Sequence, residues 1–241
     1  MSTSTTLLSR SIRRLSILSL VALALIGGAF YFRLSRSSAE TPLSVVQGAF
    51  PDPVINLPAS QAKGMQTLVL AGGCFWGVEA VFEHLNGVSD VVSGYAGGSA
   101  ETANYGLVSF GQTGHAESVK VTYDPAMISY GQLLKVYFAV AHNPTQVNRQ
   151  GSDTGKQYRS AIFFENDDQK RVAQAYIDQL NQAGTFRKPI ATQLAPLNGF
   201  YAAEANHQDF IDRHPNYPYV VIHDLPKLKQ LKEQFVAFYK N

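Results

Sequence analysis

Residues 67–87 have the sequence T-L-V-L-A-G-G-C-F-W-G-V-E-A-V-F-E-H-L-N-G. Across the Gly-Gly pair, this stretch changes from a short apolar run to a helical pattern. The run Thr67–Ala71 is typical of a buried strand, and Gly72-Gly73 ends it. The segment Phe75–Leu85 then predicts a helix, because its apolar residues recur on one stripe. This strand-turn-helix order places Cys74 at the junction between the strand and the helix.

Further strands and helices follow without regular alternation. The pairs Ser129 with Gln132 and Asn166 with Gln169 are typical of helix starts. Strands are predicted at Val88–Tyr95, Glu117–Tyr123, Tyr158–Phe164 and Ile190–Leu197, and helices at Ser129–Ala141, Asn166–Gln182 and Pro226–Tyr239. We therefore expect an α+β fold, a single domain with a mixed β-sheet covered by helices as a two-layer α/β sandwich with a βαβ-type core.

Two long segments between these elements are rich in Gly, Asn, Thr and His and poor in apolar residues. They cover residues 96–116 and 142–157. Long loops inside a compact domain usually carry function, so we expect these two to contribute to the functional site.

Residues 1–36 are typical of a membrane-targeting segment. Residues 15–32 form an uncharged apolar run flanked by arginines, and its eighteen residues span roughly 27 Å as a helix, close to the thickness of a bilayer core. We favour an uncleaved membrane anchor with the following domain exported to the periplasm or another extracytoplasmic compartment. Gly27-Gly28-Ala29 leaves open a cleaved signal segment and a secreted protein.

Residues 37–63 contain four prolines with scattered Ser, Ala and Gln, a composition that suits an extended linker. We therefore assign the folded domain to residues 64–241. The formal charge of the whole chain is +2, but residues 1–36 hold five arginines and no acid, so the remaining chain carries −3. A basic face for binding nucleic acid is not expected.

Cys74 is the only cysteine in the chain, and this excludes an intramolecular disulfide, a multi-cysteine zinc site and a C-x-x-C redox pair. At the start of a helix, unpaired N–H groups and the helix dipole stabilise a thiolate, so we expect a lowered pKa for Cys74. A lone cysteine is most often an inert buried residue. Against that interpretation, Gly72-Gly73 permits close approach of a ligand, and Phe75-Trp76 places two aromatic rings beside the sulfur.

Five segments together resemble the type A peptide methionine sulfoxide reductases. They occur in the family's order between residue 66 and at least His207. The segments are Gly73-Cys74-Phe75-Trp76-Gly77, Gly114-His115-Ala116-Glu117, Tyr123-Asp124-Pro125, His142-Asn143-Pro144 with Arg149-Gln150-Gly151 and Asp153, and Gln157-Tyr158-Arg159-Ser160. The family more often has Asp at the position of Asn143.

The resemblance implies a reductase that converts the S-epimer of methionine sulfoxide in proteins or peptides to methionine. Its chemistry needs a nucleophile, a proton donor, hydrogen bonds to the sulfoxide oxygen and an apolar pocket for the methyl group. By similarity, Cys74 is the nucleophile and Glu117 is the proton donor, which requires a pKa raised by an apolar environment. The remaining roles fall to Tyr105 and Tyr158 as donors to the oxygen, Phe75 and Trp76 around the methyl group, and Asp153 in substrate recognition.

Gly73, His115 and His207 match the family's pattern as supporting positions without assigned chemistry. We expect no metal, since no second histidine or cysteine lies at ligand spacing from His115. No cofactor is implied either, because the thiol supplies the electrons. Taken alone, Glu117 is better interpreted as an exposed carboxylate, and Tyr105 and Tyr158 are equally half-buried packing residues.

Many relatives carry further cysteines that resolve the oxidised nucleophile, and this chain has none. After one turnover Cys74 would be a sulfenic acid that an external thiol must attack. The partner is then a thioredoxin-like protein, a glutaredoxin-like protein or glutathione. Nothing in the sequence indicates oligomerisation, so we expect a monomer.

Two other classes compete with this interpretation. One is an inactive membrane-tethered module that binds sulfoxides or methionine through an aromatic pocket. The other is a cysteine hydrolase in which a histidine activates Cys74. The first is disfavoured because Cys74, Glu117, Tyr105 and Tyr158 occur together, and the second because no residue is marked to orient a histidine.

Overall fold

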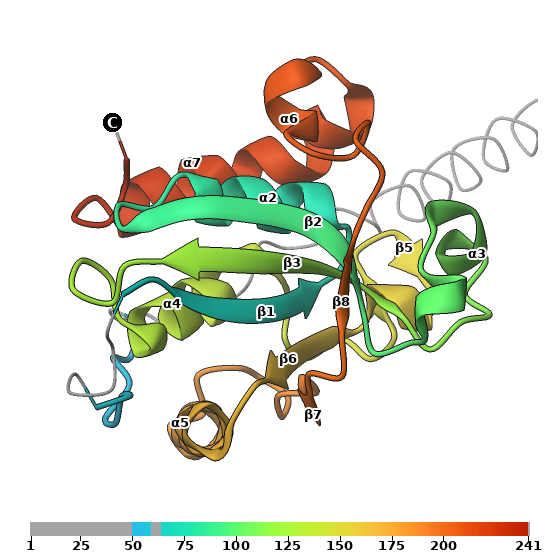
Figure 1. Cartoon of the computed structure of the whole chain (residues 1–241). Coiled ribbons are helices and arrows are strands. Elements are labelled where there is room, and N and C mark those ends of the chain that lie inside the picture. The colour runs from blue at the N-terminus through green and yellow to red at the C-terminus, as the bar shows by residue number, and fades with distance from the viewer. Residues whose placement is uncertain (1–49, 59–63, 241) are drawn as a thin grey trace, which may run out of the picture. The chain divides into compact units, whose positions relative to one another are not determined.

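Strand β1 (Gln66–Gly72) lies at the centre of a six-stranded sheet with the order β7-β6-β1-β3-β2-β8 (Figure 1). The computed structural model describes residues 50–58 and 64–240, which belong to one compact unit. The other strands of the sheet are β2 (Val88–Ala96), β3 (Ala116–Tyr123), β6 (Ser160–Phe164), β7 (Gln193–Pro196) and β8 (Phe200–Ala202). A separate pair joins β4 (Arg149–Gln150) to β5 (Asp153–Thr154).

The pairing makes the sheet mixed. β1 is antiparallel to both β3 and β6, β2 is antiparallel to β3 and β8, and β6 is parallel to β7. Helix α5 (Asp167–Gln182) connects the parallel pair β6 and β7, which is a βαβ unit. The C-terminal end of β1 therefore lies beside the N-terminal ends of β3 and β6.

Six α-helices belong to the described part of the chain. Besides α5 they are α2 (Phe75–Glu83), α3 (Tyr105–Ser109), α4 (Tyr130–Val136), α6 (Phe210–Arg213) and α7 (Leu225–Gln234). Two π-helical segments, Tyr137–Ala141 and Val220–Asp224, continue α4 and lead into α7. Two 3₁₀ turns complete the set at Ala100–Thr102 and Lys156–Tyr158.

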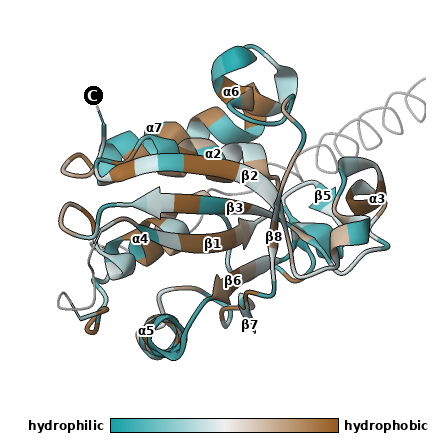
Figure 2. Cartoon of the chain, viewed as in Figure 1, coloured by the Kyte–Doolittle hydropathy of each residue, from teal (hydrophilic) through white to brown (hydrophobic). Residues whose placement is uncertain are grey.

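The two faces of the sheet differ in what covers them. Leu68 and Leu70 point into the main core, which includes the apolar sides of α2, α4 and α5. Val69 and Ala71 point to the opposite face, where a smaller cluster includes Phe163. Figure 2 shows hydrophobic residues along the central strands and a mainly hydrophilic α5. The predicted α+β fold, a helix-covered mixed sheet, is confirmed.

Several predicted boundaries shift. The strand expected at Tyr158–Phe164 begins at Ser160, because Tyr158 lies in a 3₁₀ turn, and the one expected at Ile190–Leu197 is shortened to β7. The helix predicted from Ser129 has the expected capping box but becomes π-helical at Tyr137. The long loops also contain short elements that the sequence analysis did not predict, namely α3, β4 and β5.

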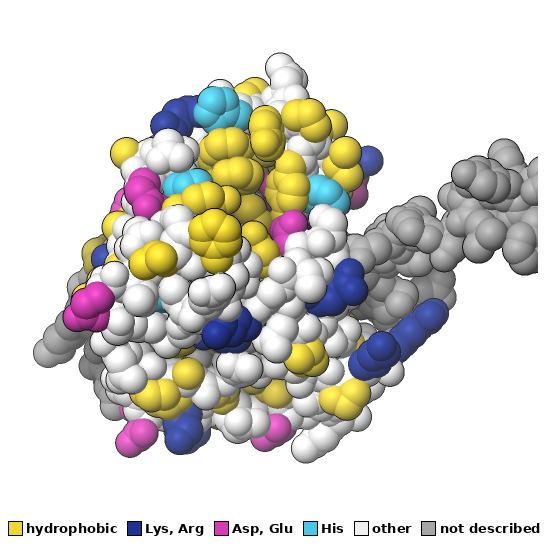
Figure 3. Space-filling model, turned by 90° about the vertical axis from the view of Figure 1, so that its right-hand side faces the viewer, with side chains coloured by type: hydrophobic (Ala, Val, Ile, Leu, Met, Phe, Trp, Pro, Cys, Tyr) yellow, Lys and Arg dark blue, Asp and Glu magenta, His cyan; other side chains and the backbone are white. Residues whose placement is uncertain are grey.

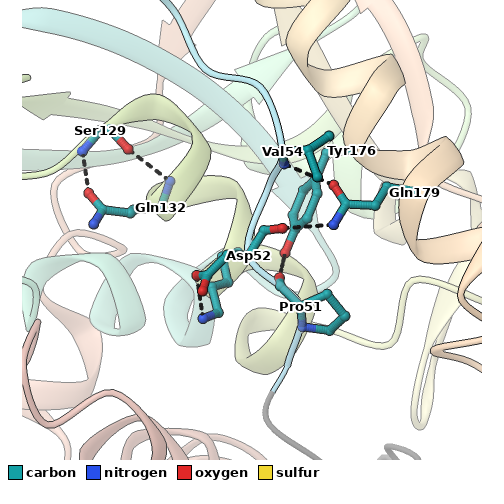
Figure 4. A network of polar contacts seen from close by, with 8 residues as sticks. Pro51, Asp52, Val54, Ser129, Gln132, Tyr176 and Gln179 are labelled. Carbon is teal, nitrogen blue, oxygen red and sulfur yellow. Dashed lines mark hydrogen bonds and ion pairs between the residues drawn. The ribbon is translucent and has the colours of Figure 1, made fainter.

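Residues 50–58 of the predicted linker lack regular secondary structure but pack on the domain. The Phe50 side chain is buried in the main core. Tyr176 Oη donates to the Pro51 carbonyl at 2.6 Å, and Gln179 bonds both Asp52 O and Val54 N (Figure 4). The expectation of an extended linker is therefore wrong for this part, because its aromatic residue and backbone groups find partners on α5.

The predicted targeting segment at residues 1–36 lies outside the described residues, as do 37–49 and 59–63. Within the ranges 50–58 and 64–240, no helix is both long and apolar enough to cross a membrane.

Candidate active site

The sheet topology brings three chain segments to one end of the molecule. Gly72 at the end of β1 pairs with Ser160 at the start of β6, and Leu70 pairs with Val119 of β3. Cys74 follows β1, Glu117 is the second residue of β3, and Tyr158 precedes β6, so the antiparallel pairing places all three at the same end of the sheet. The loops that contain α3 and β5 meet at this end too (Figure 1).

Cys74 is the N-cap residue of α2 and is half-buried. The preceding Gly73 has φ +94°, a left-handed conformation that favours glycine. A Cβ at Gly73 would lie 2.6 Å from the side chain of Gln150, and one at Gly72 would lie 3.2 Å from His142. The expectation that Gly72-Gly73 admits a ligand is therefore wrong: the space beside them is filled by the protein's own side chains.

A pocket of about 220 Å³ opens at this end. Figure 3 faces it and shows hydrophobic side chains gathered in one patch of the surface. The structure brings together all seven residues predicted to be catalytic or substrate-binding, and two more tyrosines join them. The lining residues are Cys74, Phe75, Trp76, Tyr105, Glu117, Asp153, Tyr158, Tyr217 and Tyr219.

Glu117 is buried behind the thiol. Its Oε2 accepts a hydrogen bond from the backbone N–H of Phe75, at 3.1 Å, in the first turn of α2. Burial raises the pKa of Glu117 to about 8, although the Phe75 N–H opposes that rise. A carboxyl group with such a pKa is largely protonated at neutral pH and can donate a proton.

The pKa of Cys74 is raised well above its usual value, so the expected lowering is wrong for the free protein. Desolvation is the largest cause of this rise, followed by the charges of Glu117 and Asp224. The backbone N–H of Trp76 and the charge of Lys227 lower the pKa. The helix N-terminus is present, but burial and two neighbouring carboxylates outweigh it. Cys74 therefore rests as a thiol in the free protein.

Three tyrosines keep their protons over the working pH range. Burial raises the pKa of Tyr105, Tyr158 and Tyr219. Tyr219 also donates its hydroxyl hydrogen to a carboxylate oxygen of Asp153. These three hydroxyl groups are therefore hydrogen-bond donors rather than phenolates.

One wall of the pocket is a stack of aromatic rings. Trp76 lies parallel to Phe210 with 3.7 Å between ring centroids, and Tyr217 and Tyr219 meet Trp76 edge-on. These three partners of Trp76 were not predicted, because they follow Cys74 by more than 130 residues. The only local signal was the aromatic spacing of Tyr217-Pro218-Tyr219.

The supporting positions lie around the pocket rather than in its lining. His207 accepts a hydrogen bond from Trp76 Nε1 at 3.2 Å and packs against Tyr105 with 4.3 Å between ring centroids. His115 is buried and its Nε2 bonds the Ser99 carbonyl at 2.9 Å. Both histidines therefore position neighbours. In the described ranges no three His, Cys, Asp or Glu side chains gather in a way that could hold a metal ion.

Comparison with known proteins decides the family. The family model described as "Peptide methionine sulfoxide reductase" matches residues 66–238. The chain belongs to the peptide methionine sulfoxide reductase family. It is 54% identical over 195 residues to peptide methionine sulfoxide reductase MsrA 2 of Synechocystis, covering 80% of this chain and 91% of that relative. It is 57% identical to the protein of that name from Mesorhizobium japonicum, covering 74% and 91%.

Solved structures agree with the type A assignment. Reduced Mxr1 of Saccharomyces cerevisiae is 32% identical with a TM-score of 0.58, covering 70% of this chain and 94% of that chain. Methionine sulfoxide reductase A of Corynebacterium diphtheriae is 32% identical with a TM-score of 0.54, covering 74% and 87%. The chain is thus an oxidoreductase that reduces methionine sulfoxide, and neither the inactive binding module nor the cysteine hydrolase gains support.

Proposed function

We propose that Cys74 reduces the S-epimer of methionine sulfoxide by direct attack on the sulfoxide sulfur, with Glu117 as proton donor. One observation carries this proposal: the only thiol of the chain and a buried carboxyl group of raised pKa line the same aromatic pocket. The pocket contains every group that the chemistry needs.

Atoms, protons and electrons balance with Cys74, Glu117 and the sulfoxide as the only reacting groups. Glu117 protonates the sulfoxide oxygen as the Cys74 sulfur attacks, and the proton lost by the thiol restores Glu117. The S=O bond breaks, the oxygen ends on Cys74 as a sulfenic acid, and methionine leaves as a thioether. The substrate sulfur gains two electrons and the cysteine sulfur loses two. No proton is consumed overall.

Selectivity for one epimer follows from three separate contacts with the substrate. Tyr105 and Tyr158 donate hydrogen bonds to the oxygen, while Phe75 and Trp76 enclose the methyl group. Asp153, held by Tyr219, lies at the pocket edge and would bind the polar backbone next to the oxidised side chain. The sulfoxide oxygen, the methyl group and the rest of the substrate side chain are thus held by different residues, and this arrangement accepts only one configuration at sulfur.

An external thiol completes the cycle, because the chain has no second cysteine. That thiol displaces hydroxide from the Cys74 sulfenic acid, releasing water and forming a mixed disulfide, and a further thiol then frees Cys74. A thioredoxin-like protein, a glutaredoxin-like protein or glutathione has the required chemistry. The protein acts as a monomer in this scheme.

The proposed location at a membrane is based on the sequence of residues 1–36. The uncharged run 15–32, flanked by arginines, would anchor the chain in a membrane with the catalytic domain exported. Fractionation tests this proposal: an anchored chain stays with membranes after high-salt and carbonate washes. Release of a shortened chain into the soluble fraction would support a cleaved signal segment instead.

An assay with separated epimers tests the proposed chemistry. With dithiothreitol as reductant, the chain should convert S-methionine sulfoxide peptides to methionine and leave R-peptides unchanged. Cys74→Ser should abolish turnover while keeping the circular dichroism spectrum. Equal reduction of both epimers, or turnover by the folded Cys74→Ser variant, would contradict the proposal.

A further inference from the structure

The start of α7 approaches the first turn of α2 closely at Gly77. A Cβ at Gly77 would lie 2.1 Å from Asp224 Oδ1 and 2.7 Å from Lys227 Nζ, so only glycine fits here. Gly77 follows Cys74 by three residues, which places it one helical turn further along α2. The last glycine of the G-C-F-W-G segment thus admits a carboxylate and an ammonium group beside the helix end.

Asp224 and Lys227 form an ion pair with 3.1 Å between Oδ1 and Nζ. The Asp224 side chain has no exposed surface, and its Oδ2 has no hydrogen-bond partner among the described residues. A buried ion pair contributes little net stability, because desolvating two charges offsets their attraction. Fold stability therefore does not explain the presence of this pair, and its position beside the thiol suggests a role there.

The N-terminus of α2 is crowded with acidic groups. Cys74 occupies the N-cap position, Glu117 accepts a hydrogen bond from the Phe75 N–H, and Asp224 lies against Gly77. Tyr105, Tyr158 and Tyr219 line the same pocket as the thiol. The charges of Asp153 and His223 act on Asp224, and the charge of Lys227 acts on Cys74. Several acidic groups therefore compete for the positive end of the helix dipole, which favours the ionised form of each.

We propose that the Asp224–Lys227 ion pair is a positioning element for Cys74, which holds the first turn of α2 and sets how readily the thiol loses its proton. Asp224 opposes thiolate formation and Lys227 favours it, so the intact pair keeps the two effects in balance. The catalytic meaning of this inference rests on the proposed role of Cys74 as nucleophile. The electrostatic effect itself does not.

The charges predict opposite shifts for the two single variants. Asp224→Asn leaves the Lys227 charge beside the thiol and should lower the pH midpoint of Cys74 alkylation by roughly one unit. Lys227→Met leaves the Asp224 charge and should raise that midpoint. The double variant carries neither charge and should return close to the wild-type midpoint. Loss of packing alone would move both single variants in the same direction.

The test is the rate of iodoacetamide alkylation of the full-length chain between pH 6 and pH 10.5. Because Cys74 is the only thiol, the rate reports on it whether or not it is the nucleophile. Sulfoxide reduction by the folded Cys74→Ser variant separates the two questions: turnover without the thiol, together with shifted alkylation midpoints, would contradict the role of Cys74 and not the electrostatic effect.

The exposed ion pair Lys229–Glu233 on the same helix is the matched control, and Lys229→Met should leave the midpoint unchanged. Lys227→Arg keeps the charge and should also retain the wild-type midpoint. If Asp224→Asn does not fold, Lys227→Met and Lys227→Arg carry the test. The proposal would be overturned if Asp224→Asn and Lys227→Met shifted the alkylation midpoint in the same direction. It would also be overturned if these variants folded and showed no shift of the midpoint.

Discussion

At the scale of single residues, the proposed role of Glu117 as proton donor ties the reaction to the proton that this carboxyl group carries. Activity that needs protonated Glu117 should fall as the pH rises through about 8, the pKa that burial imposes. Glu117→Gln cannot donate a proton, so we expect kcat to fall by roughly 100-fold and the decline near pH 8 to disappear. The measurement is kcat against pH, with the exposed Glu101→Gln as control.

The two tyrosine hydroxyl groups proposed to hold the sulfoxide oxygen give a second prediction. Tyr105→Phe and Tyr158→Phe each remove one donor while keeping the ring, so each should lower kcat by roughly 100-fold. Tyr201→Phe is the control, because its ring packs on His115 outside the pocket lining. Unchanged kcat in both pocket variants would remove these tyrosines from the mechanism.

How far sequence predicts this site depends on distance along the chain. Cys74, Phe75 and Trp76 are adjacent, and their chemistry stands out in one short segment. Tyr217, Tyr219 and Asp224 reach the same pocket or helix end only through the path of the C-terminal segment, which no local pattern reveals. The wrong pKa expectation for Cys74 has the same origin, since Asp224 and the burial around the thiol are tertiary effects.

At the scale of elements, α2 carries acidic groups on its buried side. Burial raises the pKa of Glu79 to about 7 and that of Glu83 to about 8, and the negative charge of Asp209 before α6 adds to both shifts, although the backbone of Asp209 lowers the pKa of Glu79. The folded state therefore holds these protons more tightly than the unfolded chain. Stability should fall as the pH rises from about 4.5, the unfolded value, towards 7–8.

Glu79→Gln tests this linkage because it removes the charge and nearly keeps the shape. The free energy of unfolding should increase by about 1–2 kcal/mol at pH 8 and change little at pH 5. Urea unfolding at both pH values measures it, with the exposed Glu233→Gln as control. An equal effect of Glu79→Gln at both pH values would contradict the charge explanation.

The elements that sequence predicts best are those with clear periodicity and caps. The strand before Cys74, helix α2 and the capped start of α4 follow from local patterns. β8 and the short α3 were not predicted, because each depends on contacts with distant segments. β8 pairs with β2, and Tyr105 at the start of α3 donates its N–H to Glu204.

At the scale of the whole molecule, residues 50–58 belong to the folded unit although their composition resembles a linker. Phe50 lies in the core with 6.0 Å between its ring centroid and that of Phe186, and Asn56 accepts from the Gly131 N–H at 3.0 Å. Sequence could not show this, because prolines and polar residues fit both a tether and a docked segment.

Two deletions test the contribution of this segment. Removing residues 1–63 should cost about 2–4 kcal/mol more stability than removing residues 1–49, through the lost burial and hydrogen bonds of residues 50–58. Urea unfolding compares them, and Phe50→Ala within the longer protein should reproduce most of the loss. Equal unfolding midpoints for both deletions would contradict a docked segment.

The most direct test of the whole account is a single turnover without reductant. One equivalent of an S-methionine sulfoxide peptide should yield one equivalent of methionine and remove the one free thiol of the chain. Mass spectrometry after dimedone trapping should place a sulfenic acid adduct on Cys74. Formation of methionine with the thiol intact and no adduct on Cys74 would contradict the central claim.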